Sequence, residues 1–259
     1  DDGNTLYCGG INTWESTDGG QNWDLVNHWY GGSDVQSVHA DKHFLVFNNG
    51  IVYECNDGGL YKTDNGTDWD NISNGIINSQ MYRLGVSQTE SNATITGLQD
   101  NGTKLLHTDG TWNDVKGGDG MECLIDYTDY NIQYGTYTNG QISRTTDLWT
   151  NTTAIEPTSD GAWVTPYIIH PSSPATLYAG YEDVWKTIDR GDSWTQISSF
   201  ASDDKIRSMA ISASNPQVLY VADLDQLWKT TNDGTSWTEL SGLPSSSYIT
   251  SIAIKMIMK

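Results

Sequence analysis

The sequence of 259 residues predicts an all-β protein, on three observations. A Ser/Thr-Asp-Gly-Trp motif recurs along the chain. Short apolar or alternating runs are separated by turns rich in Gly, Asn, Asp and Pro, which is typical of short strands. No segment keeps the 3.6-residue apolar period of a helix. Because all-β folds often reach about 250 residues as one unit, we expect residues 1–259 to form a single domain.

The recurring motif has a nearly constant spacing. Full copies run over Ser16–Trp23, Lys62–Trp69, Thr187–Trp194 and Thr230–Trp237, and shortened copies over Thr108–Trp112 and Thr145–Trp149. The tryptophans that close these copies are 46, 43, 37, 45 and 43 residues apart. A period of about 40–50 residues is typical of the four-stranded blade of a β-propeller.

Each repeat has the internal order that a blade requires. In one repeat an apolar run at Trp163–Ile169 is followed by shorter runs at Thr176–Ala179, Asp183–Thr187 and Ser193–Ile197. The motif forms the turn between the third and fourth runs. We therefore expect four strands per repeat, and we expect Trp23, Trp69, Trp194 and Trp237 to occupy equivalent, largely buried places.

The two ends of the chain predict the number of blades. Thr250–Ile254 aligns with the first strand at Arg207–Ile211, and Asn4–Tyr7 aligns with the second strand at Ala175–Tyr178. The N-terminal repeat therefore lacks a first strand, and the C-terminal segment supplies one. This predicts a single β-propeller of six four-stranded blades whose N- and C-terminal strands share one blade. The apolar ending Lys255–Lys259 departs from this pattern and leaves open a piece of a longer propeller.

The Ser/Thr-x-Asp-x-Gly-x-Thr/Ser-Trp motif resembles the Asp-box, or BNR repeat, of sialidases and other propellers. The resemblance implies that Asp18, Asp64 and Asp189 organise their own turns, where a carboxylate accepts backbone N–H groups. A second resemblance is to secreted glycosyl hydrolase-like or sortilin-like BNR-repeat proteins, especially those of Bacteroidetes. It is based on the loops Gly97–Thr103 and Gly117–Gly120 together with the stretch His39–His43.

The catalytic patterns of the family's enzymes are not evident in the chain. Sialidases need three arginines around the substrate carboxylate and an Arg-Ile-Pro stretch. This chain has only Arg83, Arg144, Arg190 and Arg207, and no Arg-Ile-Pro. Xyloglucanases of the family clasp the glycan between two propellers, and only one is predicted here.

Composition narrows the classes of partner and the cellular location. Thirteen basic and 33 acidic residues give a net charge of −20, which argues against nucleic acid and anionic membranes. No apolar stretch is long enough for membrane insertion, and no signal peptide opens the chain, so an exported protein would be present as its mature form or a fragment. Cys8, Cys55 and Cys123 are widely spaced and indicate neither a zinc site nor a disulfide framework. We expect a secreted or cell-surface protein that is a monomer.

Candidate functional residues come from the loops that share one face of a propeller, between blades and between second and third strands. Candidate acid–base groups are Asp41, Asp100, Asp119 and Glu122, and candidate ligand-binding groups are Trp29, Tyr30, His39, His43, Asp57, Gln99, Asn101 and Trp163. His39, Asp41 and His43 alternate, so on a strand they would share one side and could hold a transition metal. The carboxylates suit Ca²⁺ or an acid–base pair, and the aromatic rings suit sugars. The alternatives are Asx turns and packing between blades.

Two functions remain open from the sequence. The first is a binding module that presents an acidic, aromatic rim to a glycan or an extracellular protein and requires no cofactor. The second is a sialidase- or xyloglucanase-like glycoside hydrolase that uses a carboxylate pair at the channel mouth. We favour binding, because no complete catalytic constellation is visible.

Overall fold

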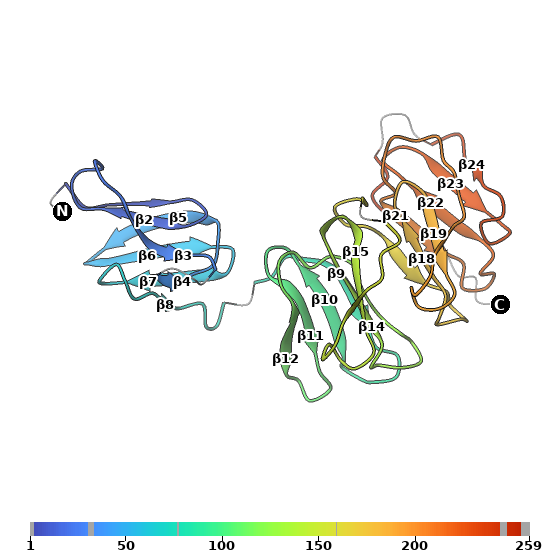
Figure 1. Ribbon diagram of the computed structural model, residues 1–259, viewed down its shortest axis with the longest axis horizontal. Coiled ribbons are helices and arrows are strands. Elements are labelled where there is room, and N and C mark those ends of the chain that lie inside the picture. Colours follow the sequence, from blue (N-terminus) through green and yellow to red (C-terminus); the bar gives the residue numbers. More distant parts are fainter. Residues whose placement is uncertain (1–2, 31–33, 77, 159, 244–247, 255–259) are drawn as a thin grey trace. The chain divides into compact units, whose positions relative to one another are not determined.

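The computed structural model describes residues 3–30, 34–76, 78–158, 160–243 and 248–254, and these residues form six four-stranded sheets (Figure 1). The helical structure in this described part is one short 3₁₀ turn, η1 (Thr138–Gly140). The predicted all-β fold with six four-stranded blades is therefore confirmed. The chain divides into two compact units, Asp1–Asn78 and Ser79–Lys259, and each is described by itself.

The first unit contains two sheets. One has the order β1 (Leu6–Gly9), β2 (Thr13–Ser16), β3 (Asp24–His28) and β4 (Gln36–Ser37); the other has β5 (Lys42–Asn48), β6 (Ile51–Asn56), β7 (Gly59–Thr63) and β8 (Asp70–Asn71). All pairings are antiparallel except that of β3 with β4, which is parallel. Val26, Val38, Val52 and Trp69 form the buried apolar core of this unit.

The second unit contains four antiparallel meanders. Their strands are β9 (Met81–Val86), β10 (Thr94–Leu98), β11 (Gly102–Leu106) and β12 (Trp112–Lys116); β13 (Cys123–Ile125), β14 (Gln133–Tyr137), β15 (Gln141–Thr145) and β16 (Thr153–Ala154); β17 (Tyr167–Ile169), β18 (Leu177–Gly180), β19 (Val184–Thr187) and β20 (Thr195–Gln196); and β21 (Ser208–Ile211), β22 (Leu219–Ala222), β23 (Leu227–Thr230) and β24 (Thr238–Glu239). Apolar clusters fill the space between neighbouring sheets, for example Tyr134 and Ile142 against Tyr167 and Leu177.

The structure does not show the predicted blade shared by the N-terminal and C-terminal strands. The first sheet takes all four strands from residues 6–37, and the described residues 248–254 contain no strand. In the first sheet the place of the fourth strand is taken by β4, which pairs in parallel with β3, with Asn27 opposite Gln36. A strand exists only through its pairing, and among the described residues Thr250–Ile254 has no strand partner.

One backbone hydrogen bond recurs where the chain passes from sheet to sheet. In the second unit the N–H of a residue in the segment that follows a sheet donates to a carbonyl at or just after the end of that sheet's second strand. The pairs are Gly120 to Leu98 at 2.9 Å, Gly161 to Asn139 at 3.0 Å, Ile206 to Tyr181 at 2.7 Å and Ile249 to Leu224 at 2.8 Å. In the first unit Lys42, the first residue of β5, donates to Gly10, just after β1, at 2.8 Å. These bonds bring the two kinds of loop together at one edge of the sheets.

The Asp-containing turns lie between third and fourth strands, as the motif predicts, and share one pattern of bonds. The Thr187 hydroxyl donates to Asp189 Oδ1 at 2.6 Å and accepts the Gly191 N–H at 2.9 Å. The same carboxylate accepts the Ser193 N–H at 2.9 Å. These donors lower the pKa of Asp189 to about 2, the Ser193 hydroxyl contributing most. Asp189 is thereby committed to its own turn, as expected.

Two of the turns differ from the aligned motif. In the second copy the accepting side chain is Asn65 rather than Asp64, because the turn is one residue shorter: the Thr63 hydroxyl donates to Asn65 Oδ1 at 3.1 Å. In the fourth copy Trp149 occupies the position of the motif glycine, with φ of 67°, and its N–H donates to the Thr145 hydroxyl at 2.9 Å. The prediction that Trp149 is the closing tryptophan is therefore wrong.

The burial expected of the four closing tryptophans is found only in part. Trp69 is buried, Trp194 and Trp237 are half-buried, and Trp23 is 40% exposed. Trp194 Nε1 donates to the Ile155 carbonyl of the preceding sheet at 2.5 Å, whereas Trp23 Nε1 donates to Gly20 of its own turn at 3.1 Å. Trp23 belongs to the first sheet, which has no preceding sheet in its unit to pack against.

The residue before the motif glycine reaches back to the preceding sheet. Arg190, with φ of 62°, contacts the fully buried Asp126 carboxylate at 3.1 Å. The equivalent Asp233, with φ of 58°, accepts from the Tyr178 hydroxyl at 2.6 Å and contacts Lys186 Nζ at 2.5 Å. These two turns thus each carry one charge that is paired with an opposite charge of the sheet before it.

We expect Trp194→Ala to lower the free energy of unfolding of the second unit by about 3 kcal/mol, because a packed aromatic ring and its inter-sheet hydrogen bond are lost. The matched control is Trp112→Ala, since Trp112 is 52% exposed in the same unit and its replacement should change stability by less than about 1 kcal/mol. Urea unfolding followed by circular dichroism measures both. Equal losses would contradict this role of Trp194.

Candidate functional site

Two glycine-rich loops of the second unit, one after β10 and one after β12, are joined by hydrogen bonds at the edge where the sheets connect. The Gly102 N–H donates to the Gly118 carbonyl at 2.6 Å, and the Asp100 N–H donates to Asp119 Oδ1 at 3.0 Å. A Cβ on Gly97 would lie 2.1 Å from the Met121 carbonyl oxygen, so only glycine permits this approach. Asp119 therefore positions the Gln99–Asn101 turn, and Asn101 Nδ2 contributes by donating to the Gln99 carbonyl at 3.2 Å.

Glu122 lies just after these loops and just before β13. Its Oε2 contacts Nε of Arg83, on β9, at 3.1 Å, and its side chain is 14% exposed. Burial raises the pKa of the Glu122 carboxyl from 4.5 to about 7, and the nearby Arg83 guanidinium only partly opposes this shift. The backbone of Glu122 is fixed, because its carbonyl accepts the Tyr167 hydroxyl at 2.9 Å. Glu122 can therefore gain or lose a proton near neutral pH.

An aromatic residue, Trp163, is oriented by a chain of hydrogen bonds that reaches Tyr82, the neighbour of Arg83 on β9. Trp163 Nε1 donates to the Tyr82 hydroxyl at 3.1 Å, and the Tyr82 hydroxyl donates to Gln99 Oε1 at 2.9 Å. Trp163 is 50% exposed, so its ring is oriented by its N–H while much of its surface stays open to a ligand. Tyr82 is on β9 and Trp163 precedes β17, so residues distant in sequence meet here.

We call these five residues, Tyr82, Arg83, Gln99, Glu122 and Trp163, the Glu122 rim. The sequence predicted Gln99, Glu122 and Trp163 from their loops. It did not predict Tyr82 and Arg83, which lie on the first strand of a blade, where no loop rule points to them. The available signal was an arginine next to an aromatic residue in a strand otherwise apolar at Met81, Leu84 and Val86.

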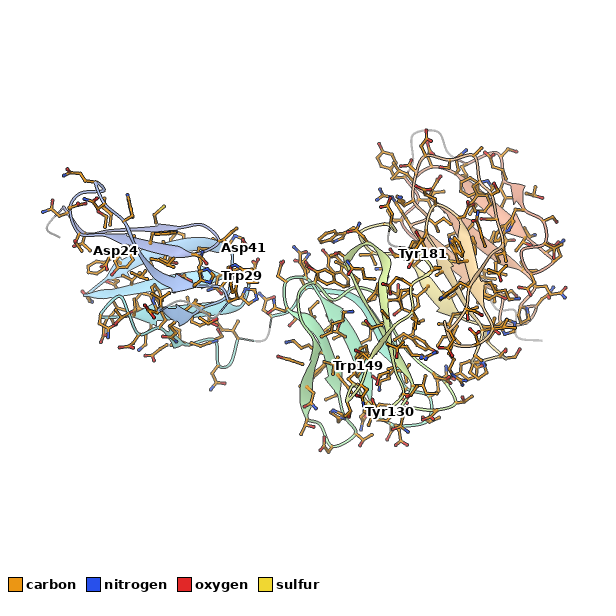
Figure 2. All side chains as sticks on the ribbon, in the orientation of Figure 1. Asp24, Trp29, Asp41, Tyr130, Trp149 and Tyr181 are labelled. Carbon is orange, nitrogen blue, oxygen red and sulfur yellow. The ribbon has the colours of Figure 1, made fainter. Side chains whose placement is uncertain are left out.

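The remaining candidates lie in the first unit. Trp29 and Tyr30 are 50% and 56% exposed and pack edge to face, with ring centroids 4.5 Å apart (Figure 2). His28 adds a second edge-to-face contact to Tyr30 at 4.3 Å. The three rings form a small exposed aromatic patch after β3. Whether Trp29 and Tyr30 bind a ligand stays a prediction.

The predicted alternation of His39, Asp41 and His43 on one strand is wrong. The strand β5 begins only at Lys42, and Asp41 has φ of 58°, which breaks the alternation. His43 Nε2 lies 2.6 Å from Asp57 Oδ1, while the His39 side chain lies against Gly58. In the part of the chain that the structure describes, these three residues do not form a group of metal ligands.

A group of carboxylates with metal-like spacing occurs elsewhere, at Asp204, Asp223 and Asp225. Asp223 is buried, and its oxygens accept the Ser202 hydroxyl at 2.6 Å and the Gln226 N–H at 2.7 Å. These donors belong to the surrounding loops, so the geometry is that of a loop organised by a carboxylate. Ca²⁺ binding by this protein stays a prediction.

Among the described residues, no helix has the length and apolarity needed to cross a membrane.

Comparison with known proteins identifies the fold. No family model matches the sequence, and no curated protein matches it. Among solved structures, an ancestral GH74 enzyme has a TM-score of 0.54 at 18% identity over 80% of this chain. The extracellular domain of a putative one component system from B. thetaiotaomicron has a TM-score of 0.53 at 13% identity over 98% of the chain. The GH74 xyloglucanase from Xanthomonas campestris has a TM-score of 0.51 at 13% identity over 92% of the chain.

This chain is similar to only part of each of those structures. It spans 32%, 37% and 43% of their respective lengths. At these identities the likeness shows the fold alone. The protein is thus an all-β protein of the propeller class, and its function has to be argued from its own side chains.

Glu122→Gln should change how stability depends on pH. A carboxyl whose pKa is raised on folding stabilises the folded state below the unfolded pKa, and this contribution is lost as pH rises through the folded pKa of about 7. The wild type should therefore lose thermal stability, relative to Glu122→Gln, between about pH 5 and about pH 8. Parallel melting temperatures of the two proteins over this range would contradict a raised pKa.

Proposed function

We propose that the protein is a glycan-binding propeller module and that the Glu122 rim is its binding site. The observation that carries the proposal is Trp163, which is half-exposed yet held in one orientation through Tyr82 and Gln99. Sugar rings present apolar C–H faces bordered by hydroxyl groups. An oriented aromatic face with hydrogen-bonding groups beside it matches both features of such a ligand.

The polar groups of the rim supply the second part of the argument. The Arg83 guanidinium offers several donors, and the Glu122 carboxyl accepts or donates depending on its proton. Both are held by the contact between them at 3.1 Å, so few rotamers have to be fixed on binding. The net charge of −20 favours a neutral ligand over a polyanion.

We expect Trp163→Ala to weaken binding of xyloglucan oligosaccharides about tenfold or more, because a central aromatic contact is lost. Xyloglucan is the first probe because one similar structure is a xyloglucanase. Isothermal titration calorimetry measures the affinity. Trp112→Ala, which removes an equally exposed tryptophan on β12, is the matched control and should leave binding unchanged.

Equal effects of the two variants would contradict binding at this site. The wild type could bind a different oligosaccharide and not xyloglucan. If Trp163→Ala then loses binding of that oligosaccharide, the site is supported and the ligand is that oligosaccharide instead of xyloglucan. A panel of neutral and acidic oligosaccharides therefore accompanies the first probe.

A glycoside hydrolase is the second candidate function, and one observation favours it. Glu122, with a pKa near 7, is suited to protonate a leaving group at neutral pH. The reaction also needs a second carboxylate, and Asp100, Asp119 and Asp41 are the other candidates from the sequence. Release of reducing sugar that disappears in Glu122→Gln would establish hydrolysis. Binding without release would support the module.

We further propose that the protein acts outside the cell, as a secreted or surface-displayed monomer. A similar structure is an extracellular domain, and a glycan partner is consistent with that location. An extracellular protein remains the alternative partner. Fractionation of the source cells tests the location, and sedimentation equilibrium tests the monomer.

A further inference from the structure

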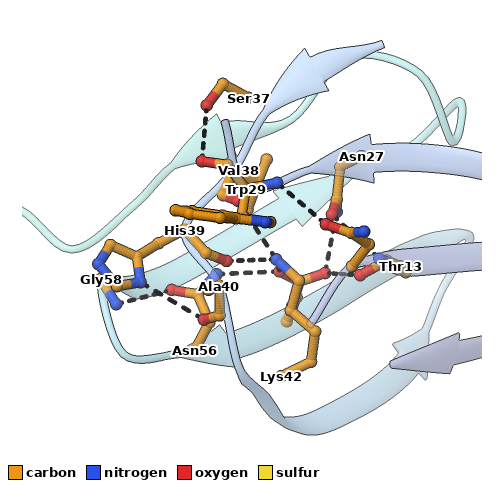
Figure 3. A network of polar contacts seen from close by, with 12 residues as sticks. Thr13, Asn27, Trp29, Ser37, Val38, His39, Ala40, Lys42, Asn56 and Gly58 are labelled. Atoms are coloured by element: carbon orange, nitrogen blue, oxygen red, sulfur yellow. Dashed lines mark hydrogen bonds and ion pairs between the residues drawn. The ribbon is translucent and has the colours of Figure 1, made fainter. Parts of the chain in front are cut away.

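The first unit contains a buried polar network that the glycan site does not use (Figure 3). Lys42 Nζ lies 2.8 Å from Glu54 Oε1, and both side chains are fully buried. Glu54 Oε2 accepts the Thr13 hydroxyl at 2.5 Å and Asn27 Nδ2 at 3.1 Å. Placing a lysine and a glutamate in the interior is costly in free energy, and such pairs are weak evidence for stability alone. A chemical role would explain why the Lys42–Glu54 pair is buried.

Asn56 contacts the same carboxylate as Lys42. Its Nδ2 donates to the same oxygen, Glu54 Oε1, at 2.9 Å, so the amine and the amide share one carboxylate atom. Lys42 and Asn56 are also direct partners in the pairing of β5 with β6. Asn56 Oδ1 is held by the Gly58 N–H at 3.0 Å, a donor that polarises the amide carbonyl.

We propose that Lys42 and Asn56 form an intramolecular isopeptide bond, with Glu54 as the group that transfers protons between them. The neutral Lys42 amine attacks Cγ of Asn56, and the bond from Nζ to Cγ forms. The bond from Cγ to Nδ2 breaks, and the nitrogen leaves as ammonia. Glu54 takes a proton from Nζ and gives it to Nδ2, so it ends as it began. No oxidant or other reactant is needed.

The surroundings of Lys42 favour this reaction in three ways. Burial lowers the pKa of the Lys42 ammonium, against the opposing pull of Glu54, and so favours the neutral amine that attacks. Fixed strands hold the reactants together, which replaces a bimolecular encounter. The backbone carbonyls of His39 and Val38 also accept from Nζ and hold it beside Glu54, and Nζ gives up one of its three acceptors when it becomes the neutral amine.

The test is the mass and the peptide map of the wild-type protein. The intact mass should be lower than the sequence mass by one ammonia. Digestion after glutamate separates Ser16–Glu54, which contains Lys42, from Cys55–Glu90, which contains Asn56. We expect these two peptides to be recovered as one branched species in most molecules after reduction and denaturation.

Variants distinguish the reaction from other losses of ammonia. Lys42→Arg and Glu54→Gln should give separate peptides at the full sequence mass. Asn56→Asp should still give the branched species, now with loss of one water. The matched control is Lys62→Arg on β7, because Lys62 is a partly exposed lysine whose replacement should leave the branched species intact.

The decisive measurement is made on the wild type, so it does not depend on a variant that fails to fold. Separate wild-type peptides would overturn the proposal. So would a loss of ammonia confined to an Asn-Gly site such as Asn65–Gly66, where ring closure gives no branched peptide. A link from Lys42 to Asn27 lies within Ser16–Glu54 and would also overturn the assignment to Asn56.

Discussion

The backbone hydrogen bond from the segment after a sheet to the end of that sheet's second strand underlies the arrangement of the loops. In the second unit it is repeated at Gly120, Gly161, Ile206 and Ile249. Because it uses only the backbone, it sets the position of both loops whatever side chains they carry. The Glu122 rim is a result of this arrangement. Residues from β9, from the loop after β10 and from the entries to β13 and β17 meet because each entry is tied to its neighbour.

The protein uses carboxylates in two opposite ways, and the environment decides which. In the turns between third and fourth strands, Asp18 and Asp189 accept several donors at the surface, and their pKa values fall to about 2. These groups stay ionised and hold their turns. Glu122 is mostly buried, and its pKa rises to about 7. The same functional group is thus structural in one place and able to exchange a proton in another.

The sequence predicted the six sheets well, because a turn motif with a fixed spacing specifies where strands begin and end. It was less accurate where a residue departs from the motif: a one-residue deletion moved the acceptor to Asn65, and a tryptophan with positive φ replaced the glycine at position 149. Gln99, Glu122 and Trp163 were predicted because a loop rule covers them. Tyr82 and Arg83 were not, because only strand packing reveals which residues of a first strand reach the rim. The buried Lys42–Glu54 pair was likewise not predicted, since a lysine at the start of a strand is normally solvated.

Two of the turns extend opposite charges to the preceding sheet, which gives each of these two junctions its own charge pattern. Arg190 meets Asp126, whereas its counterpart Asp233 meets Lys186 and Tyr178. If the last sheet followed the β13–β16 sheet directly, Asp233 would still meet a cation, because Arg144 pairs with Tyr134 as Lys186 pairs with Tyr178, but it would also lie near the Asp126 carboxylate. If the β17–β20 sheet were duplicated in tandem, Arg190 would instead lie near Lys186, and two cations would meet. Duplicating this sheet would therefore require a change of charge at the new junction, although the blades share one architecture.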